Sequence, residues 1–378
     1  MVENNETNIV IDNGTCNIKA GFSGEESPLC VLSNIIGIPN EDEKENAYVI
    51  KGESLFIGDE VFNKNSNNIK NPIQNGTITD WDYMEKMWDF IFTNQLRVDP
   101  SEHNVMITEK SLNPQINRER IIQNLFETFD VPELCIIDPG VLSLYSAGKF
   151  DGISIDSGEG ITSFVPIYDG YSLKNSIIKI DLAGKDVTEY LIKTLGYDFN
   201  LQLKTIYERK VISRLIKEEI CYVALDFQNE KINYLSKEYK MPDGNIINIK
   251  EQRFFIPEGL FKPFLYGKNL DGIAQNCFNS INKTDNDLKE DLYNCIVLSG
   301  GSTLFSGLRE RLNEEIEKLA PESMKKKVRV IAEADRKNSA WRGGSILSSL
   351  DSFNFWITRD EYYEYGEGIL RKIEHYFL

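Results

Sequence analysis

Apolar and polar residues alternate in two pairs of short stretches, and each pair is joined by a glycine turn. Residues 9–15 are a β-branched run that ends in Asp-Asn-Gly-Thr, and residues 18–22 alternate again, so together they predict a β-hairpin. Residues 153–160 repeat this pattern with Asp-Ser-Gly, and a strand-like run follows over 161–168. The two turn aspartates lie 144 positions apart, which indicates two copies of one α/β unit rather than a short-period repeat.

Helical and strand-like patterns alternate along the rest of the chain. Residues 81–96 and 117–129 have helical spacing, and the β-branched run 105–108 between them predicts a strand. This alternation predicts an α/β fold. Helical spacing is densest over 185–225, and we expect most of its apolar-face residues in the core. These residues are Tyr190, Leu191, Leu195, Val211, Leu215, Ile216 and Ile220.

Two charged segments are expected to be exposed to solvent. The acidic run 40–46 is expected to be a solvated loop, with an exposed contact loop as the functional alternative. The basic cluster 325–327 precedes a predicted strand over 328–331, and we expect a solvated strand entry rather than an anion site.

Composition and charge narrow the class of protein. A chain of 378 residues with 41% apolar content is long enough for two or three units at about 150 residues each. The 59 acidic and 42 basic residues give a net charge of −17, and the pI is about 4.8. Such a chain repels phosphate backbones, so we expect no direct nucleic-acid partner.

Cysteine and histidine usage excludes several kinds of site. The six cysteines form no CxxC pair, which favours reduced intracellular thiols over a disulfide framework or a zinc cluster. With only two histidines, His103 and His375, a Ser/His/Asp triad is not expected. Residues 1–8 are polar, and no run of about 18 apolar residues occurs, so we expect a cytoplasmic protein without membrane insertion.

The paired glycine turns suit a polyphosphate. Glycine allows backbone N–H groups to approach phosphate oxygens closely, and Asp12 and Asp156 are placed to orient a hydrated Mg²⁺. A single Asp-X-Gly is usually an ordinary turn, so it is the pairing that carries weight. Residues 296–303 add a strand that runs into Gly300-Gly301 before a predicted helix over 308–319, an arrangement that suits a nucleotide but also has a structural explanation.

With these motifs the sequence resembles the actin family. The segments Asp12-Asn13-Gly14-Thr15 with Lys19-Ala20-Gly21-Phe22, and Asp156-Ser157-Gly158-Glu159-Gly160, are similar to the family's two phosphate loops. The resemblance runs from residue 9 to about residue 366. It includes residues 71–73, 80–82, 108–109, 112–114, 126–129, 141–145, 165–168, 181–184, 221–227, 298–301 and 341–347.

The resemblance implies two related RNase H-like α/β lobes around a cleft that holds ATP or ADP with Mg²⁺ or Ca²⁺. The small lobe would comprise residues 1–146 and 338–378, with a contact-loop subdomain over about 34–71. The large lobe would comprise 147–337, with a helical subdomain over about 185–271. Asp12 and Asp156 would orient the metal through water and serve as the catalytic carboxylates. The implied nucleotide contacts are Gly14, Thr15, Lys19, Gly158, Gly160, Gly184, Lys217, Glu218, Gly300, Gly301, Phe305 and Lys337.

The sequence departs from the family where the attacking water is handled. Pro139 stands where the family has a water-positioning glutamine, and Ser163 where it has a histidine. Proline has no side-chain amide, so the resemblance implies a weak Mg-dependent ATPase at most, unless Asp138 or Glu159 orients water instead. Cys16 replaces a glycine in the first loop and crowds the phosphate approach. The loop 39–56 is acidic and slightly longer than in the family, the stretch 228–241 is shorter, and the tail 375–378 differs.

Three functions remain open from the sequence. The full-length resemblance favours a cytoskeletal filament subunit that self-associates and binds actin-binding proteins. The altered loop, tail and water-handling positions favour a non-polymerising subunit of a larger complex, with ATP as a structural ligand. A sugar kinase or chaperone ATPase of the same superfamily is disfavoured, because such relatives are not expected to share residues 341–347.

Overall fold

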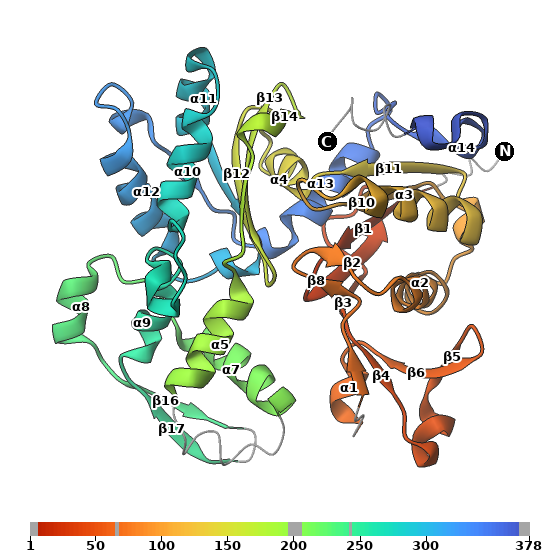
Figure 1. Cartoon of the computed structure of the whole chain (residues 1–378), viewed down its shortest axis with the longest axis horizontal. Coiled ribbons are helices and arrows are strands. Elements are labelled where there is room, and N and C mark those ends of the chain that lie inside the picture. The colour runs from red at the N-terminus through yellow and green to blue at the C-terminus, as the bar shows by residue number, and fades with distance from the viewer. Residues whose placement is uncertain (1–6, 65–67, 196–205, 242–243, 370–378) are drawn as a thin grey trace. The chain divides into compact units, whose positions relative to one another are not determined.

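The computed structural model describes residues 7–64, 68–195, 206–241 and 244–369, and the chain divides into two compact units (Figure 1). The first unit contains Met1–Asp151, Ile167–Lys174 and Asn338–Leu378. The second contains Gly152–Pro166 and Asn175–Lys337.

The main sheet of the first unit is built around the strand that ends at the first turn. Its strand order is β20-β11-β10-β1-β2-β3. Strand β1 pairs antiparallel with β2 and parallel with β10, and β10 pairs parallel with β11. The bounds are β1 (Ile9–Asn13), β2 (Asn17–Phe22), β3 (Cys30–Ser33), β10 (Val105–Thr108), β11 (Glu133–Ile137) and β20 (Ile357–Thr358). The hairpin and the strand predicted over 105–108 are therefore confirmed.

The sheet that carries the second turn has the same plan. Its order is β14-β13-β12-β18-β19, with β15 also paired to β13. Strand β12 pairs parallel with β18, β18 pairs parallel with β19, and β13 pairs antiparallel with β14 and β15. The bounds are β12 (Gly152–Ser157), β13 (Thr162–Tyr168), β14 (Tyr171–Ser172), β15 (Ile178–Ile180), β18 (Ile296–Ser299) and β19 (Val330–Ile331).

In both sheets an antiparallel hairpin begins at a central strand, and two parallel strands continue on the other side. Strand β12 therefore corresponds to β1, and β18 corresponds to β10. A shared strand order is expected if one α/β unit was duplicated, as the matching turns predict. The predicted fold class, two related α/β lobes, is confirmed.

Helices cover the first unit's sheet and fix the position of β1. The Trp341 indole donates to the Val10 carbonyl oxygen at 3.0 Å, which anchors α13 on β1. A Cβ at Gly343 would lie 1.8 Å from the Leu142 carbonyl oxygen, so only glycine permits α13 to approach α4 this closely. The helices are α2 (Trp81–Phe90), α3 (Gln115–Gln123), α4 (Pro139–Ser146), α13 (Ser339–Ser348) and α14 (Arg359–Tyr365). Helices α2 and α3 continue as π-helical segments, Ile91–Leu96 and Asn124–Thr128, so both predicted helices are confirmed.

A smaller sheet of the first unit has the order β5-β6-β4-β7, beside the short helix α1 (Glu60–Asn63). Its strands are β4 (Ile36–Ile38), β5 (Tyr48–Ile50), β6 (Glu53–Ile57) and β7 (Asn68–Lys70), and β8 (Ile73–Gln74) and β9 (Thr77–Ile78) form a separate hairpin. The solvation predicted over 40–46 is confirmed, because Glu41–Asn46 has no buried residue, but this segment is a 3-10 helix rather than an irregular loop. Three acidic residues in its first turn complement the positive end of the helix dipole.

The second unit adds helices around its sheet and one separate hairpin. The helices are α5 (Gly184–Thr194), α7 (Ile206–Ile220), α8 (Phe227–Asn233), α9 (Gln252–Glu258), α10 (Ile273–Asn282), α11 (Lys289–Asn294) and α12 (Leu308–Leu319), and the hairpin pairs β16 (Lys237–Lys240) with β17 (Ile246–Ile249). The helical prediction over 185–225 is confirmed for α5 and α7, and residues 196–205 lie outside the described part. The core assignment of Leu215 was wrong, since 40% of this residue is exposed.

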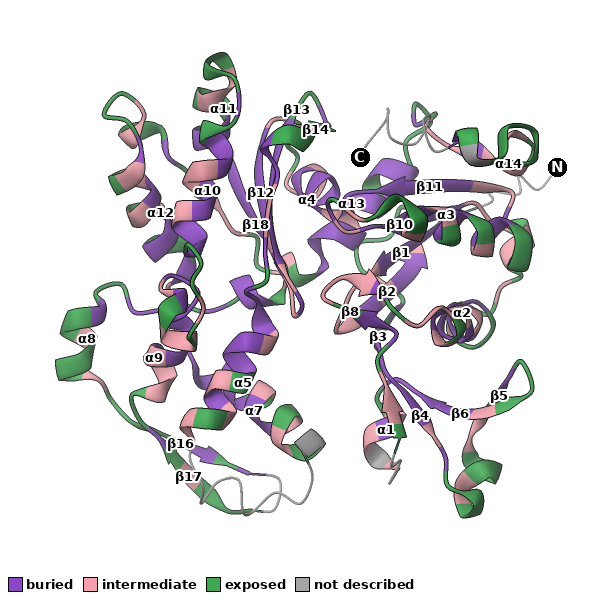
Figure 2. Ribbon diagram, in the orientation of Figure 1, coloured by how far each residue is buried: buried purple, intermediate pink, exposed green. Residues whose placement is uncertain are grey.

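Each unit has its own apolar core, and the strands that carry the two turns run through it. Figure 2 shows the buried residues concentrated on β1 and β11 in the first unit and on β12 and β18 in the second. The basic cluster Lys325–Lys327 is a 3-10 turn in which Lys325 pairs with Glu322 and Lys327 with Glu290. These two ion pairs agree with the solvated interpretation of that cluster.

Candidate functional site

The first half of the candidate site is the turn between β1 and β2. Asp12 is buried at the end of β1, and both of its carboxylate oxygens have partners. Lys19 on β2 lies opposite Asp12 in the hairpin register, and its Nζ is 2.6 Å from Oδ2. The Thr108 hydroxyl, at the end of β10, donates to Oδ1 at 3.0 Å. The geometry holds one carboxylate and one lysine together at the base of the turn.

Neighbouring segments hold the backbone of this turn from two sides. Asn34 donates to it twice, from its side chain to the Gly14 carbonyl oxygen at 3.0 Å and from its backbone to the Cys16 carbonyl oxygen at 2.8 Å. The Thr15 hydroxyl accepts from the Gly76 N–H at 2.9 Å. Gly14 is needed sterically, because a Cβ there would lie 2.5 Å from the Asn17 carbonyl oxygen.

The second half of the candidate site is the turn after β12. Asp156 lies opposite Ser299 in the parallel register of β12 and β18, and the Ser299 hydroxyl donates to its Oδ1 at 2.7 Å. Gly300 follows with φ of +83°, and a Cβ there would lie 2.9 Å from Asp156 Oδ1. The predicted residues Asp156 and Gly300 are therefore close neighbours.

Helix α5 begins against the same turn. The Gly158 carbonyl oxygen accepts from the Gly184 N–H at 3.0 Å and from the Ser302 hydroxyl at 2.6 Å. A Cβ at Gly184 would lie 2.6 Å from the Ser302 Oγ, 2.7 Å from Glu159 Oε2 and 3.1 Å from the Gly158 carbonyl oxygen, so a side chain there would displace these groups. By contrast, a Cβ at Gly158 or Gly301 would meet no atom within 4 Å. The Gly158 carbonyl oxygen is thus held by two hydrogen bonds, whereas no atom fills the space where a Cβ of Gly158 or Gly301 would lie.

Lys217 connects α7 to this region. Its Nζ donates to the Gly184 carbonyl oxygen at 3.1 Å and to the Thr188 hydroxyl at 3.0 Å, and it lies 3.6 Å from Glu159 Oε2. Burial raises the pKa of the Glu159 carboxyl above its ordinary value, although the positive charge of Lys217 opposes this shift. Lys217 and Gly184, both predicted site residues, are in direct contact.

The remaining predicted site residues are Gly160, Glu218, Phe305 and Lys337. Gly160 and Phe305 are buried, whereas the side chains of Glu218 and Lys337 are exposed. Glu218 lies 4.0 Å from Arg214 on its own helix. Lys337 follows Arg336, whose carbonyl oxygen accepts from the Gly300 N–H at 3.1 Å, so the chain passes close to the glycine turn there. The first unit contains Asp12, Gly14, Thr15 and Lys19, and the second contains the others.

Pro139, where the resemblance implies a departure from the family, has a structural role. Pro139 is the first residue of α4, where its fixed φ suits a helix start, and Asp138 caps that helix by accepting from the Gly140 N–H at 2.7 Å. Ser163 is buried on β13, in register with Lys179 on β15. Cys16 is half-buried in the first turn, and the other cysteines are buried.

The two turns fit a metal-bound polyphosphate in their chemistry. Each turn offers one oriented carboxylate, which matches the one or two carboxylates that usually hold phosphate-bound Mg²⁺. Lys19 supplies a positive charge for phosphate, and the open positions at Gly158 and Gly301 leave room for close approach. The Gly14 and Gly158 N–H groups close their own turns at 3.1 and 3.3 Å, so a phosphate oxygen would share these donors. Among the residues that the structure describes, no three His, Cys, Asp or Glu side chains gather as metal ligands.

Several residues that shape the turns escaped prediction as site residues. Thr108, Asn34, Ser299 and Ser302 each donate a hydrogen bond to a predicted residue. One signal was present in the sequence, because Thr108 and Ser299 are hydroxyl residues at the carboxyl ends of apolar strands.

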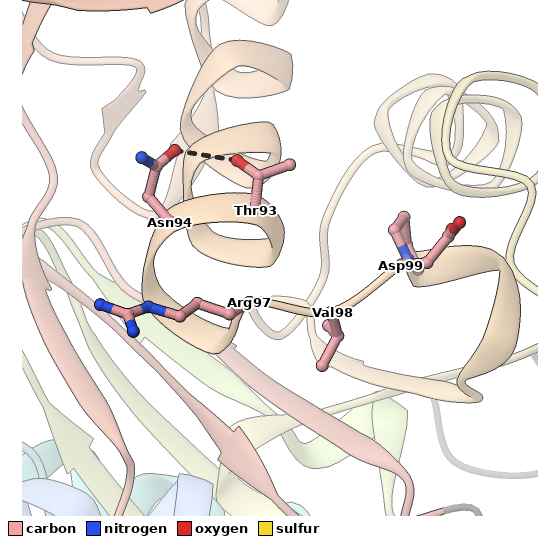
Figure 3. A pocket seen from close by; sticks show the side chains of 6 residues that line it. Thr93, Asn94, Arg97, Val98 and Asp99 are labelled. Carbon is pink, nitrogen blue, oxygen red and sulfur yellow. Dashed lines mark hydrogen bonds between the residues drawn. The ribbon is translucent and has the colours of Figure 1, made fainter.

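A hollow elsewhere on the first unit belongs to neither turn. It lies where the π-helical segment after α2 ends, and it is lined by Thr93, Asn94, Arg97, Val98, Asp99 and Pro100 (Figure 3). Thr93 donates to Asn94 within it, and Asp99 caps the next 3-10 turn, so these polar groups serve local structure.

Two α/β units of one topology, each with an aspartate at a glycine-containing turn, define a duplicated α/β protein of the nucleotide-binding type. The sequence model of the actin family matches residues 3–374, and the chain belongs to the actin family. Proteins of this family generally bind a nucleotide with a divalent cation, and the chain is an actin-like ATP-binding protein. In the described ranges, no helix combines the length and apolar character needed to span a bilayer.

Proposed function

We propose that this chain binds Mg-ATP through both turns and polymerises into cytoskeletal filaments whose assembly depends on the nucleotide. The observation that carries the proposal is the matched pair of turns, in which Asp12 and Asp156 occupy equivalent strands and each carboxylate accepts from a hydroxyl across a parallel pair. Membership of the actin family supports the same function, because its members are typically cytoskeletal.

The proposed roles follow from the contacts of each residue. Lys19 and the turn amides of Gly14, Thr15, Gly158 and Gly160 would bind phosphate oxygens, and Asp12 and Asp156 would orient the hydrated cation. The cation, when bound, supplies positive charge that stabilises the phosphates. Lys217 holds Gly184 and Thr188 in place, and the proposed adenosine contacts are Gly184, Lys217, Glu218, Gly300, Gly301, Phe305 and Lys337.

Hydrolysis is proposed to be slow. Pro139 offers no amide, and the carboxylate of Asp138 already caps α4. Glu159 lies beside Lys217, so an alternative water-orienting role would compete with that ion pair. ATP would therefore act mainly as a ligand that stabilises the protomer and permits assembly.

A non-polymerising subunit of a larger complex is the second candidate. The exposed acidic 3-10 helix Glu41–Asn46 favours it, because these like charges on a proposed contact loop oppose association of identical chains. For the filament we propose self-association and actin-binding proteins as partners, and in either role we propose a cytoplasmic location.

A pelleting assay with Mg-ATP across a protein concentration series separates the two candidates. A critical concentration, above which all added protein pellets, supports the filament. Protein that remains in the supernatant at every concentration, while still binding Mg-ATP, supports the complex subunit.

A further inference from the structure

Thr108 and Ser299 occupy the same place in the two units. Each is the last residue of the parallel strand next to an aspartate strand, β10 beside β1 and β18 beside β12. Asp156 and Ser299 are direct register partners, and Asp12 and Thr108 follow directly after the register partners Ile11 and Ile107. The strand order, the register and the hydroxyl-to-carboxylate hydrogen bond are therefore the same in both units.

The hydrogen bonds are well formed and buried. The donor-to-acceptor distances are 3.0 Å from Thr108 to Asp12 Oδ1 and 2.7 Å from Ser299 to Asp156 Oδ1. Thr108 is 4% exposed and Ser299 is 1% exposed, so water does not compete strongly for either hydroxyl. The Thr108 hydroxyl also accepts from the Asn13 N–H at 2.9 Å, which connects the carboxylate to the turn backbone.

We propose that Thr108 and Ser299 are positioning residues, each of which sets the rotation of the aspartate carboxylate in its own turn for interaction with a hydrated cation. This inference rests on the proposed function of the two turns. An aspartate carboxylate rotates easily about its last torsion, where the preference is broad and two-fold. A hydroxyl that engages Oδ1 from the neighbouring strand removes that freedom before any ligand arrives.

The test is the Mg²⁺ dependence of ATP binding, measured with a fluorescent ATP analogue over a series of free Mg²⁺ concentrations and in EDTA. The variants are Thr108→Val and Ser299→Ala, each of which removes the hydroxyl with little change of volume. One hydrogen bond is worth about 0.5 to 1.5 kcal/mol, so each variant should need about 2- to 12-fold more Mg²⁺. Because the two hydroxyls act in different units, the double variant should show about the product of the two effects.

A structural role alone would give a different result. General loosening of the fold weakens binding with and without Mg²⁺, whereas the proposal predicts unchanged analogue affinity in EDTA. Thr108→Ser and Ser299→Thr keep the hydroxyl and should restore the Mg²⁺ dependence. The matched controls are Ser348→Ala and Ser280→Ala, which remove buried hydroxyls that bond only to backbone carbonyl oxygens.

The outcomes separate this inference from the function it rests on. If the unaltered chain shows no Mg²⁺-dependent analogue binding, the proposed function fails. If it shows such binding while Thr108→Val and Ser299→Ala match the controls, or lose affinity equally in EDTA, the proposed function stands and the positioning role is refuted.

Discussion

Gly300 lies against the backbone of Ser157: a Cβ at Gly300 would be only 2.3 Å from the Ser157 carbonyl oxygen. Gly300 also has φ of +83°, a conformation that disfavours any side chain. Two independent constraints therefore require glycine where the β18 turn meets the Asp156 turn.

Gly300→Ala should destabilise the protein by about 2 kcal/mol or more, because strain in the left-handed region adds to a clash with immobile backbone. Gly301→Ala is the matched control, since a Cβ there meets no atom within 4 Å. Thermal unfolding of the nucleotide-free variants checks this. Equal melting temperatures for both variants would show that the turn relaxes easily.

The pH dependence of stability should carry a contribution from Glu159. Its pKa is raised in the folded state, mainly by burial, so the folded chain binds this proton more tightly than the unfolded chain does. The stabilising contribution is therefore complete below the unfolded pKa, near 4.5, and is lost as the pH rises through the higher folded pKa.

Glu159→Gln should remove this dependence. The stability of the native chain minus that of the variant should fall as the pH rises above about 4.5, and then level off. Denaturant unfolding of both proteins from pH 4.5 to 8 measures the difference, with the exposed Glu25→Gln as a control. A difference that is flat, or that rises with pH, would rule out the raised pKa.

Turnover should be slower than in family members that keep the water-positioning glutamine and histidine. Positioned proton-transfer groups are worth about 10² to 10⁴ in rate. Pro139→Gln with Ser163→His should therefore raise phosphate release per protomer under assembly conditions. Pro139→Ala is the backbone control at the first position of α4. If the native chain already releases phosphate quickly and the double variant adds nothing, another residue positions the water.

Lys110→Met should weaken Mg-ATP binding about 3- to 10-fold through an indirect contact. Lys110 Nζ bonds to the Asn75 carbonyl oxygen at 3.4 Å and to the Thr77 hydroxyl, while Gly76 in the same hairpin donates to Thr15. Loss of these bonds frees the hairpin that holds the Thr15 hydroxyl. Calorimetric titration with Mg-ATP measures the change.

Two further comparisons test whether Lys110 acts through Thr15. Lys51→Met removes a lysine contact to Glu85 that is remote from the turn, and it should leave the affinity unchanged. In a Thr15→Val background the Lys110 substitution should have little further effect, because the contact it supports is already gone. Fully additive losses would mean that Lys110 acts independently of Thr15.

The sequence predicted the strands that carry the turns because their signals are local. Alternation over 9–22 and 153–168 and the Gly-Gly after β18 each lie within a few residues. The partners Thr108 and Ser299 could not be paired with their aspartates in this way, because they lie 96 and 143 positions away and only the sheet register brings them together.

Other features could not be predicted, because they depend on tertiary packing or on small differences in local stability. Leu215 fits the apolar stripe of α7, yet it is exposed, because helical spacing marks a face without fixing how much of it is covered. The segment over 40–46 has a loop-like composition, but Lys44 pairs with Glu41 one turn away in a 3-10 helix. The sequence shows a proline at position 139, whereas its role at the start of α4 depends on the helix cap that Asp138 provides.

The proposed roles of Asp12 and Asp156 in Mg-ATP binding can be measured by calorimetric titration of nucleotide-stripped protein with Mg-ATP. We expect saturable binding that is strongly weakened by Asp156→Ala or Asp12→Ala. Asp151→Ala, which removes only an exposed contact to the Asp169 N–H, should bind normally. At about 100 times its dissociation constant the ligand should add about 2.7 kcal/mol to stability. No binding by the native chain, or equal losses for Asp151→Ala and Asp156→Ala, would contradict the proposed role of the two aspartates.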